Sequence, residues 1–243
     1  MSTNPAPLQP PPPDLRASLT VALAFAKDNN DLATVCRGLC KPIDTKRFND
    51  IQARIDRIVV AKRSATSKKK RKLWNSQQNR LKGRLFEKLV GVVLDSCSVF
   101  DAHHSVQTST NELDWLVLLG PFHVFVPVMR TWGTHFICEC KMTRTALTTG
   151  WVTRLYALTQ THNTRVAVLL TAKEAGNKGN NSRTITAIRE YSLIPSPGFI
   201  LRISLDELIT CAVLGQSILE IISEKYMQLA LRTDRLRILR EQV

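Results

Sequence analysis

The sequence is short of acidic residues. Its 243 residues include 34 Lys and Arg against 20 Asp and Glu, which gives a formal net charge of +14 and a pI near 9.9. The positive excess excludes no fold, but it makes a polyanion the first partner to consider, with nucleic acid ahead of a membrane surface. Apolar residues are not scarce: at 44% of the chain they suffice for a buried core and exclude the intrinsically disordered class.

A long apolar run is also missing. The longest mostly apolar stretch, Trp115–Met129, is interrupted by Gly120 and Pro121. It is shorter than the roughly 20 residues that a membrane-spanning helix needs. Residues 4–13 are rich in proline rather than apolar, so we expect no signal peptide. We therefore expect a cytoplasmic protein with no membrane segment.

None of the six cysteines forms a C-x-x-C pair. Their spacing does not match a structural zinc site, and no local context activates one thiol as a nucleophile. Free, buried cysteines in a reducing compartment are the expectation. The six are Cys36, Cys40, Cys97, Cys138, Cys140 and Cys211.

Composition divides the chain into three parts. Residues 1–13 hold six of the eleven prolines, which predicts a disordered, polyproline-like arm. Apolar spacing of three and four residues predicts a helical N-terminal lobe over 14–75, which ends in a basic helix. Residues 76–243 have the mixed strand and helix texture of an α/β domain.

Apolar patterns predict the individual elements. The order of a strand at 135–141, a helix at 148–160 and a strand at 165–170 predicts a parallel pair joined by a right-handed crossover. Ser204 and Glu207 have the spacing of a capping box at a helix start. Further strands are predicted at 113–119, 122–128 and 199–203. Further helices are predicted from Asp14, at 31–40, from Asp44 or Thr45, from about 67 to 97, at 182–192 and at 216–240.

Charged residues interrupt three of the apolar elements. Strand alternation places Glu139 and Lys141 on one face of their strand, with Cys140 on the other. Asp114 lies near the start of another apolar strand, where a charge is costly unless it is paired or binds a metal. Glu87 interrupts an apolar run in the long helix.

Carboxylates on neighbouring strands suit a hard divalent cation such as Mg²⁺, which takes oxygen ligands from one or two carboxylates, water and phosphate. Such an ion activates a bound water and offsets the charge of a phosphorane, while a nearby lysine holds the nucleophile or the phosphate. Asp114, Glu139 and Lys141 therefore have the residue types that phosphodiester hydrolysis needs.

The pattern over residues 81–172 resembles the PD-(D/E)xK nuclease superfamily, most closely its Mrr-type and resolvase-like branches. The resemblance implies a restriction-endonuclease-like core, a mixed central sheet flanked by helices, and Mg²⁺-dependent cleavage of DNA, with Mn²⁺ as a substitute. It makes Asp114, Glu139 and the Cys140 carbonyl metal ligands, Lys141 the residue that positions the attacking water, and Glu87 an outer acid. It also implies a restriction or antiviral defence role, with a partner protein that supplies recognition or activation. If both strands are cut, we expect a homodimer formed through the C-terminal amphipathic helix.

One segment supplies much of the positive charge. The run Lys62–Arg84 contains ten Lys and Arg and no acid. A lysine-rich face that leads into the Glu87 helix could neutralise several phosphates. We expect nucleic-acid contacts from Lys68, Lys69, Lys70, Arg71, Lys72, Arg80, Lys82 and Arg84, and from Lys178 in the Gly/Asn loop.

The same residues also allow structural interpretations. Glu139 and Lys141 could form an ion pair at a sheet edge, Asp114 could belong to a turn, and Glu87 could be a surface charge. On these interpretations the chain is a non-catalytic nucleic-acid-binding module of the same fold. Cleavage of RNA is a further alternative, because phosphate contacts alone do not distinguish the two polymers. Within the helix that follows Lys141, the sequence offers only Gln160 as a polar contributor to a site.

Overall fold

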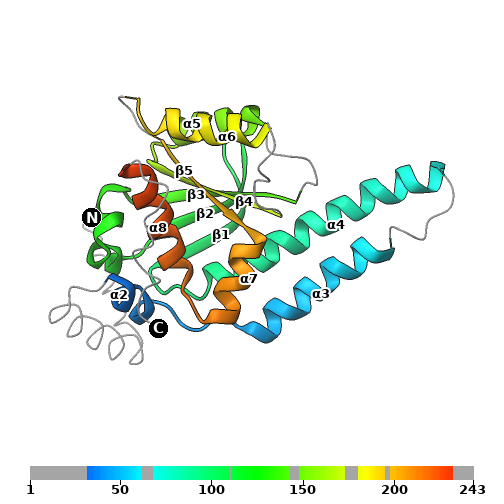
Figure 1. Ribbon diagram of the computed structural model, residues 1–243, viewed down its shortest axis with the longest axis horizontal. Helices are drawn as coiled ribbons and strands as arrows, with labels where there is room; N and C mark the ends of the chain where they lie inside the picture. Colours follow the sequence, from blue (N-terminus) through cyan, green and yellow to red (C-terminus); the bar gives the residue numbers. More distant parts are fainter. Residues whose placement is uncertain are drawn as a thin grey trace, which may run out of the picture.

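A mixed five-stranded sheet forms the centre of the fold, in the order β1-β2-β3-β4-β5 (Figure 1). The computed structural model describes residues 32–61, 68–109, 111–142, 148–172, 180–194 and 198–231. β1, β2 and β3 pair antiparallel, whereas β3, β4 and β5 run parallel. The strands are β1 Phe100–Gln107, β2 Glu112–Leu119, β3 His135–Lys141, β4 Val166–Thr171 and β5 Phe199–Ser204.

Helices cover both faces of the sheet, so the chain is an α/β protein. On one face, α5 (Thr149–Thr161) and α6 (Asn180–Tyr191) pack against apolar residues of β3, β4 and β5. On the other face, a larger core joins the sheet to α2, α3, α4, α7 and α8. Those helices are α2 Leu32–Gly38, α3 Thr45–Ala61, α4 Lys68–Leu94, α7 Leu205–Leu214 and α8 Ile218–Ala230.

The two long helices α3 and α4 lie side by side and project from the body of the fold (Figure 1). Phe48, Ile51 and Ile55 form the buried stripe of α3, with the three- and four-residue spacing of an amphipathic helix. Asp44 begins the helix by accepting a hydrogen bond from the main-chain nitrogen of Arg47. α4 runs without interruption across residues 75 and 76, where we expected the two parts of the chain to meet.

Most of the predicted elements are confirmed. The strands predicted at 113–119, 135–141, 165–170 and 199–203 are β2 to β5, and β3-α5-β4 is a parallel pair with an intervening helix. Ser204 and Glu207 form the capping box of α7. The helix predicted at 216–240 corresponds to α8, which ends at Ala230 with Leu231 as its cap. Residues 232–240 of that prediction, the arm 1–13 and the helix predicted from Asp14 lie outside the described residues.

The strand predicted at 122–128 is wrong. Two 3₁₀ helices, Pro121–Phe125 and Pro127–Thr131, occupy this segment. Each begins at a proline, which cannot donate to a sheet ladder but suits the first position of a helical turn. Val126, Met129 and Trp132 recur every third residue and are buried, which is the period of a 3₁₀ turn rather than of a strand.

Sequence patterns did not predict β1. Its residues alternate little, and five of the eight are polar, because β1 is an edge strand with much of its length exposed. Among the described residues, no helix has the length and apolar character to cross a membrane.

Gly91 marks a close approach between α4 and β2. A Cβ atom at this position would lie 2.8 Å from the Trp115 indole, whereas one at Gly83 would meet only a Glu87 oxygen at 4.0 Å. We predict that Gly91→Ala destabilises the fold by about 1–3 kcal/mol through overpacking. The matched Gly83→Ala should stabilise it by up to about 1 kcal/mol through helix propensity. Urea unfolding measures both, and equal effects of the two changes would contradict the packing.

Candidate active site

Asp114 is fixed on β2 by a hydrogen bond to the next strand. Its Oδ2 accepts from the main-chain nitrogen of Cys140 on β3, at 2.7 Å. The β2–β3 register pairs Trp115 with Cys138, so one step further along the ladder Asp114 lies opposite Glu139. Asp114 belongs to a strand, and its interpretation as a turn residue is wrong.

β1 is irregular beside Asp114. Ser105 has φ of 51° and lies between the paired positions His104↔Trp115 and Val106↔Leu113. A non-glycine residue in this left-handed region is uncommon, and such strain is often found at functional sites. In β2 the simple alternation also breaks here, since Leu113 packs with the α5 side of the core and Trp115 with the α4 side.

Glu139 and Lys141 lie on one face of β3, as strand alternation predicts. Cys138 and Cys140 pack into the α4-side core, whereas Ile137 packs on the α5 side. The Lys141 ammonium donates a hydrogen bond to the Glu139 carboxylate, and the two side chains are 15% and 5% exposed. β3 is the central strand, so this pair is buried inside the sheet and is not the ion pair at a sheet edge that the sequence allowed.

Two α5 residues that the sequence did not single out complete this group. The Lys141 ammonium lies 4.4 Å from the centre of the Trp151 ring, and the Arg154 guanidinium lies 5.6 Å from the same ring. A cation over an aromatic face is attracted to its π electrons. The sequence did hold a signal for these two residues. Trp151 and Arg154 are three residues apart in the helix that follows Lys141, so they share one face of that helix. The Gln160 amide, which the sequence offered as a contributor, instead lies beside the Thr159 hydroxyl.

Burial has the largest effect on the electrostatics of the group. Burial raises the pKa of the Glu139 carboxyl above its ordinary value, and the Asp114 carboxylate raises it further. Lys141 and Arg154 act in the opposite direction without reversing the shift in pKa. These effects together favour the protonated form of Glu139, whereas a bound cation would favour its carboxylate.

Glu87 reaches the sheet from the other side. Its Oε2 lies 3.0 Å from the Nε2 of His104 on β1, and the His104 ring packs against Trp115 with centroids 4.8 Å apart. With a side chain that is 22% exposed, Glu87 is not a freely solvated surface charge. It is close enough to β3 to contribute, after burial, Asp114 and Cys138, to the raised pKa of Cys140.

The metal-binding prediction rests on two side chains and one main-chain carbonyl. In the part of the chain that the structure describes, no three His, Cys, Asp or Glu side chains form a group that could hold a metal ion, so Glu87 does not join Asp114 and Glu139 in such a group. Two carboxylates are nevertheless what Mg²⁺ commonly takes from a protein. A cation at this position would offset the charge of Asp114, which after burial is the second cause of the raised pKa of Glu139.

The predicted phosphate-contacting residues differ in accessibility. Arg80 and Arg84 are exposed on α4, whereas Lys82 is buried, with 5% of its surface exposed. Lys82 is therefore left out of the nucleic-acid contacts that we propose below. The backbone of residues 68–72 forms the start of α4, but the side chains of Lys68, Lys69, Lys70, Arg71 and Lys72, and all of Lys178, lie outside what is described.

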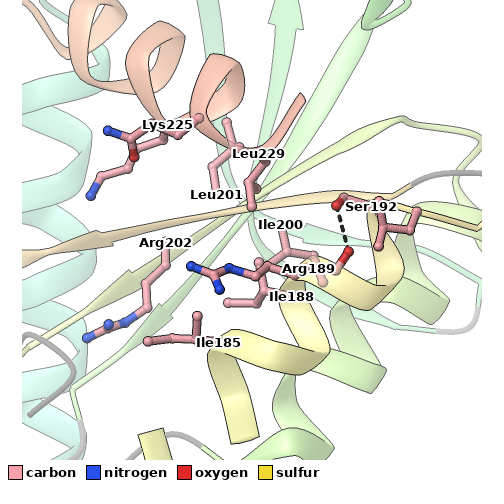
Figure 2. A pocket seen from close by; sticks show the side chains of 11 residues that line it. Ile185, Ile188, Arg189, Ser192, Ile200, Leu201, Arg202, Lys225 and Leu229 are labelled. Atoms are coloured by element: carbon pink, nitrogen blue, oxygen red, sulfur yellow. Dashed lines mark hydrogen bonds between the residues drawn. The ribbon is translucent and has the colours of Figure 1, made fainter. Parts of the chain in front are cut away.

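A separate pocket of about 500 Å³ lies at β5, between α6 and α8 (Figure 2). Isoleucine and leucine side chains form much of its lining, and its charged groups are Arg189, Arg202 and Lys225. None of the predicted catalytic residues lines it. Because its charged groups are all cations, this pocket lacks the carboxylates of the Asp114–Glu139 group.

No protein-family model, curated protein or solved structure matches the chain. A function therefore has to come from the chemistry of the site itself.

The pKa of Glu139 tests the geometry of this group directly. We predict that Asp114→Asn lowers the pKa of Glu139, because it removes a raising charge while keeping an acceptor for the Cys140 nitrogen. Lys141→Met should raise the pKa further, because it removes a lowering charge while keeping an apolar chain beside Trp151. Carboxyl ¹³C NMR titration measures both shifts.

Glu112→Gln is the control, since Glu112 is exposed at the start of β2. It should leave the Glu139 titration unchanged. Shifts of one sign for both Asp114→Asn and Lys141→Met would contradict the arrangement.

Proposed function

We propose that the chain is a metal-dependent endonuclease of the PD-(D/E)xK type that hydrolyses phosphodiester bonds in DNA. The observation that carries this proposal is the group of Asp114, Glu139 and Lys141 on adjacent strands. The mixed sheet flanked by helices supports it, because it is the kind of core that the sequence resemblance implies. The DNA substrate and the restriction-endonuclease-like core are parts of the same proposal.

Each residue has a defined task in this proposal. Asp114 and Glu139, with the Cys140 carbonyl, would hold Mg²⁺. The bound ion would supply Lewis-acid activation of water and charge compensation at the phosphate. Asp114 is already oriented by the Cys140 nitrogen, so its carboxylate is fixed before any ligand arrives. Such preorganisation is what makes a charged group effective in a transition state.

Lys141 acts on the water and the phosphate. Its ammonium is held between the Glu139 carboxylate and the Trp151 ring, which limits the directions in which its remaining hydrogens point. In this position it orients the attacking water and stabilises negative charge on the phosphate oxygens. Arg154 is exposed beside the same ring and adds positive charge where the phosphate enters.

The catalytic assignment is tested by cleavage assays. We predict that the purified chain cuts DNA with Mg²⁺ or Mn²⁺ but not with EDTA. Glu139→Ala and Lys141→Ala should each lower the rate by about 10²-fold or more. Asp114→Asn should lose cleavage yet keep DNA affinity, measured by fluorescence anisotropy. Linear, supercoiled and single-stranded DNA and RNA serve as substrates.

Glu112→Gln is the control for these variants and should cut at the normal rate. DNA binding without cleavage under any metal would support the non-catalytic binding module instead. Metal-dependent cleavage of RNA but not of DNA would keep the catalytic residues and overturn the proposed polymer.

The basic start of α4 is proposed as the surface that engages the phosphate backbone. Changing Lys68, Lys69, Lys70, Arg71 and Lys72 to Gln should weaken DNA binding and flatten its salt dependence. The slope of log K against log salt should fall in magnitude by up to about 4.5, or about 0.9 for each phosphate that is no longer neutralised. Arg130→Gln, an exposed cation on the second 3₁₀ helix, is the control. An unchanged slope in the five-residue variant would contradict this surface.

A further inference from the structure

Four cysteine thiols gather where the α3–α4 hairpin joins the body of the fold. Cys40 follows α2, Cys97 follows α4, Cys36 lies in α2 and Cys211 in α7. The pKa shifts reflect how close these cysteines lie. Burial raises the pKa of Cys97 most, and Cys40 and Cys36 raise it further. Burial and then Glu220 raise the pKa of Cys211, and Cys40 adds to that shift. None of the four takes part in a disulfide. None takes part in the carboxylate group on β2 and β3.

Two of these cysteines are held directly opposite each other. Cys40 and Cys97 form an isolated antiparallel bridge. The flanking main-chain hydrogen bonds run from Lys41 to Ser96, at 2.7 Å, and from Ser98 to Leu39, at 3.0 Å. The two cysteines are therefore the pair that makes no main-chain hydrogen bonds to each other, in which the Cα atoms lie about 4.5 Å apart and the side chains are close.

This pairing suits a disulfide. Disulfides span Cα separations of about 4.4–6.8 Å, and a non-hydrogen-bonded pair falls at the near end of that range. The Cys40 side chain is close enough to Cys97 to be, after burial, the next cause of the raised pKa of Cys97. Little main-chain movement is needed to bring the two sulfur atoms to bonding distance.

The two thiols differ in access. Cys40 is partly exposed, whereas Cys97 is buried, with 1% of its surface exposed. Cys36 and Cys211 are fully buried. A soluble reagent therefore reaches Cys40 first, and Cys97 is the neighbour that can resolve the product.

We propose that Cys40 and Cys97 are a redox modification site, which a low-molecular-weight disulfide such as glutathione disulfide converts to an intramolecular disulfide. The Cys40 thiolate attacks one sulfur of the reagent and releases one glutathione thiolate. The Cys97 sulfur, after losing its proton, attacks Cys40 and releases the second. Two cysteine thiols lose two electrons and two protons in all, and the reagent disulfide is reduced to two thiols.

The new bond would close the chain around the hairpin. Residues 40 and 97 stand just before α3 and just after α4, so the disulfide fastens the base of both helices. It restrains the end of α4 that leads into β1 and the ladder with β2. This inference is independent of the proposed nuclease function, because it concerns only the thiols and the fold.

Peptide mapping tests the proposal on the full chain. The reduced protein is equilibrated with glutathione redox buffers, alkylated, digested with trypsin without reduction and analysed by mass spectrometry. We expect the protein to lose two hydrogen atoms and residues 38–46 to become linked to residues 89–130. Cleavage after Arg37 separates Cys36 from Cys40, and each linked peptide contains a single cysteine, so the assignment is unambiguous. Dithiothreitol should reverse the link.

Variants and a denatured sample supply the controls. Cys40→Ser and Cys97→Ala should abolish the link, whereas Cys211→Ala should retain it. The native chain should form the disulfide with an equilibrium constant at least about tenfold larger than in urea, because folding holds the thiols together. A mixed disulfide that persists on Cys40 beside an alkylated Cys97, a link to Cys36 instead, or equal constants in buffer and urea would each overturn the proposal.

Discussion

A carboxylate buried at the centre of the sheet is the constraint around which the site is arranged. Glu139 lies on the middle strand, 4% exposed, where an isolated charge is expensive. Two cations offset that cost in part. The Lys141 ammonium donates a hydrogen bond to the Glu139 carboxylate, and Arg154 adds a second positive charge nearby. Asp114 opposes them. A second carboxylate opposite the first costs stability, because the two charges repel each other. Such an arrangement is more common at functional sites than elsewhere, which is the reason for the proposed function.

The two faces of the sheet serve different purposes. The α4 face is broad and apolar, and it joins the sheet to five helices through one continuous core. The α5 face holds a smaller core, and Glu139 and Lys141 lie on this face, with the Lys141 ammonium beside the Trp151 ring. Rigid packing on one face thus supports polar side chains on the other. The proposed catalytic role would need this support, because small displacements of charged atoms lower rates steeply.

The sequence was informative where one physical signal dominated. Alternation in β3 predicted that Glu139 and Lys141 share a face, because side chains two residues apart in a strand point to the same side. The segment 122–128 was wrongly predicted as a strand, because its apolar residues fit both the two-residue period of a strand and the three-residue period of a 3₁₀ helix. The prolines at 121 and 127 favour the 3₁₀ helices. β1 left little pattern because it is exposed. Trp151 and Arg154 were not predicted as site residues. Their contacts with Lys141 and with each other depend on how α5 packs over β3, and local sequence patterns do not show that packing.

The unbroken course of α4 sets a length for the molecule. From Lys68 to Glu87 the helix advances about 28 Å at its rise of about 1.5 Å per residue. On a duplex that distance corresponds to about eight base pairs. A straight helix of this length fixes the separation between residue 68 and the sheet. Under the proposed function, a nucleic acid held at both places needs a footprint of at least that span. An oligonucleotide shorter than this span would contact either the start of α4 or the sheet, and only a longer one would contact both at once.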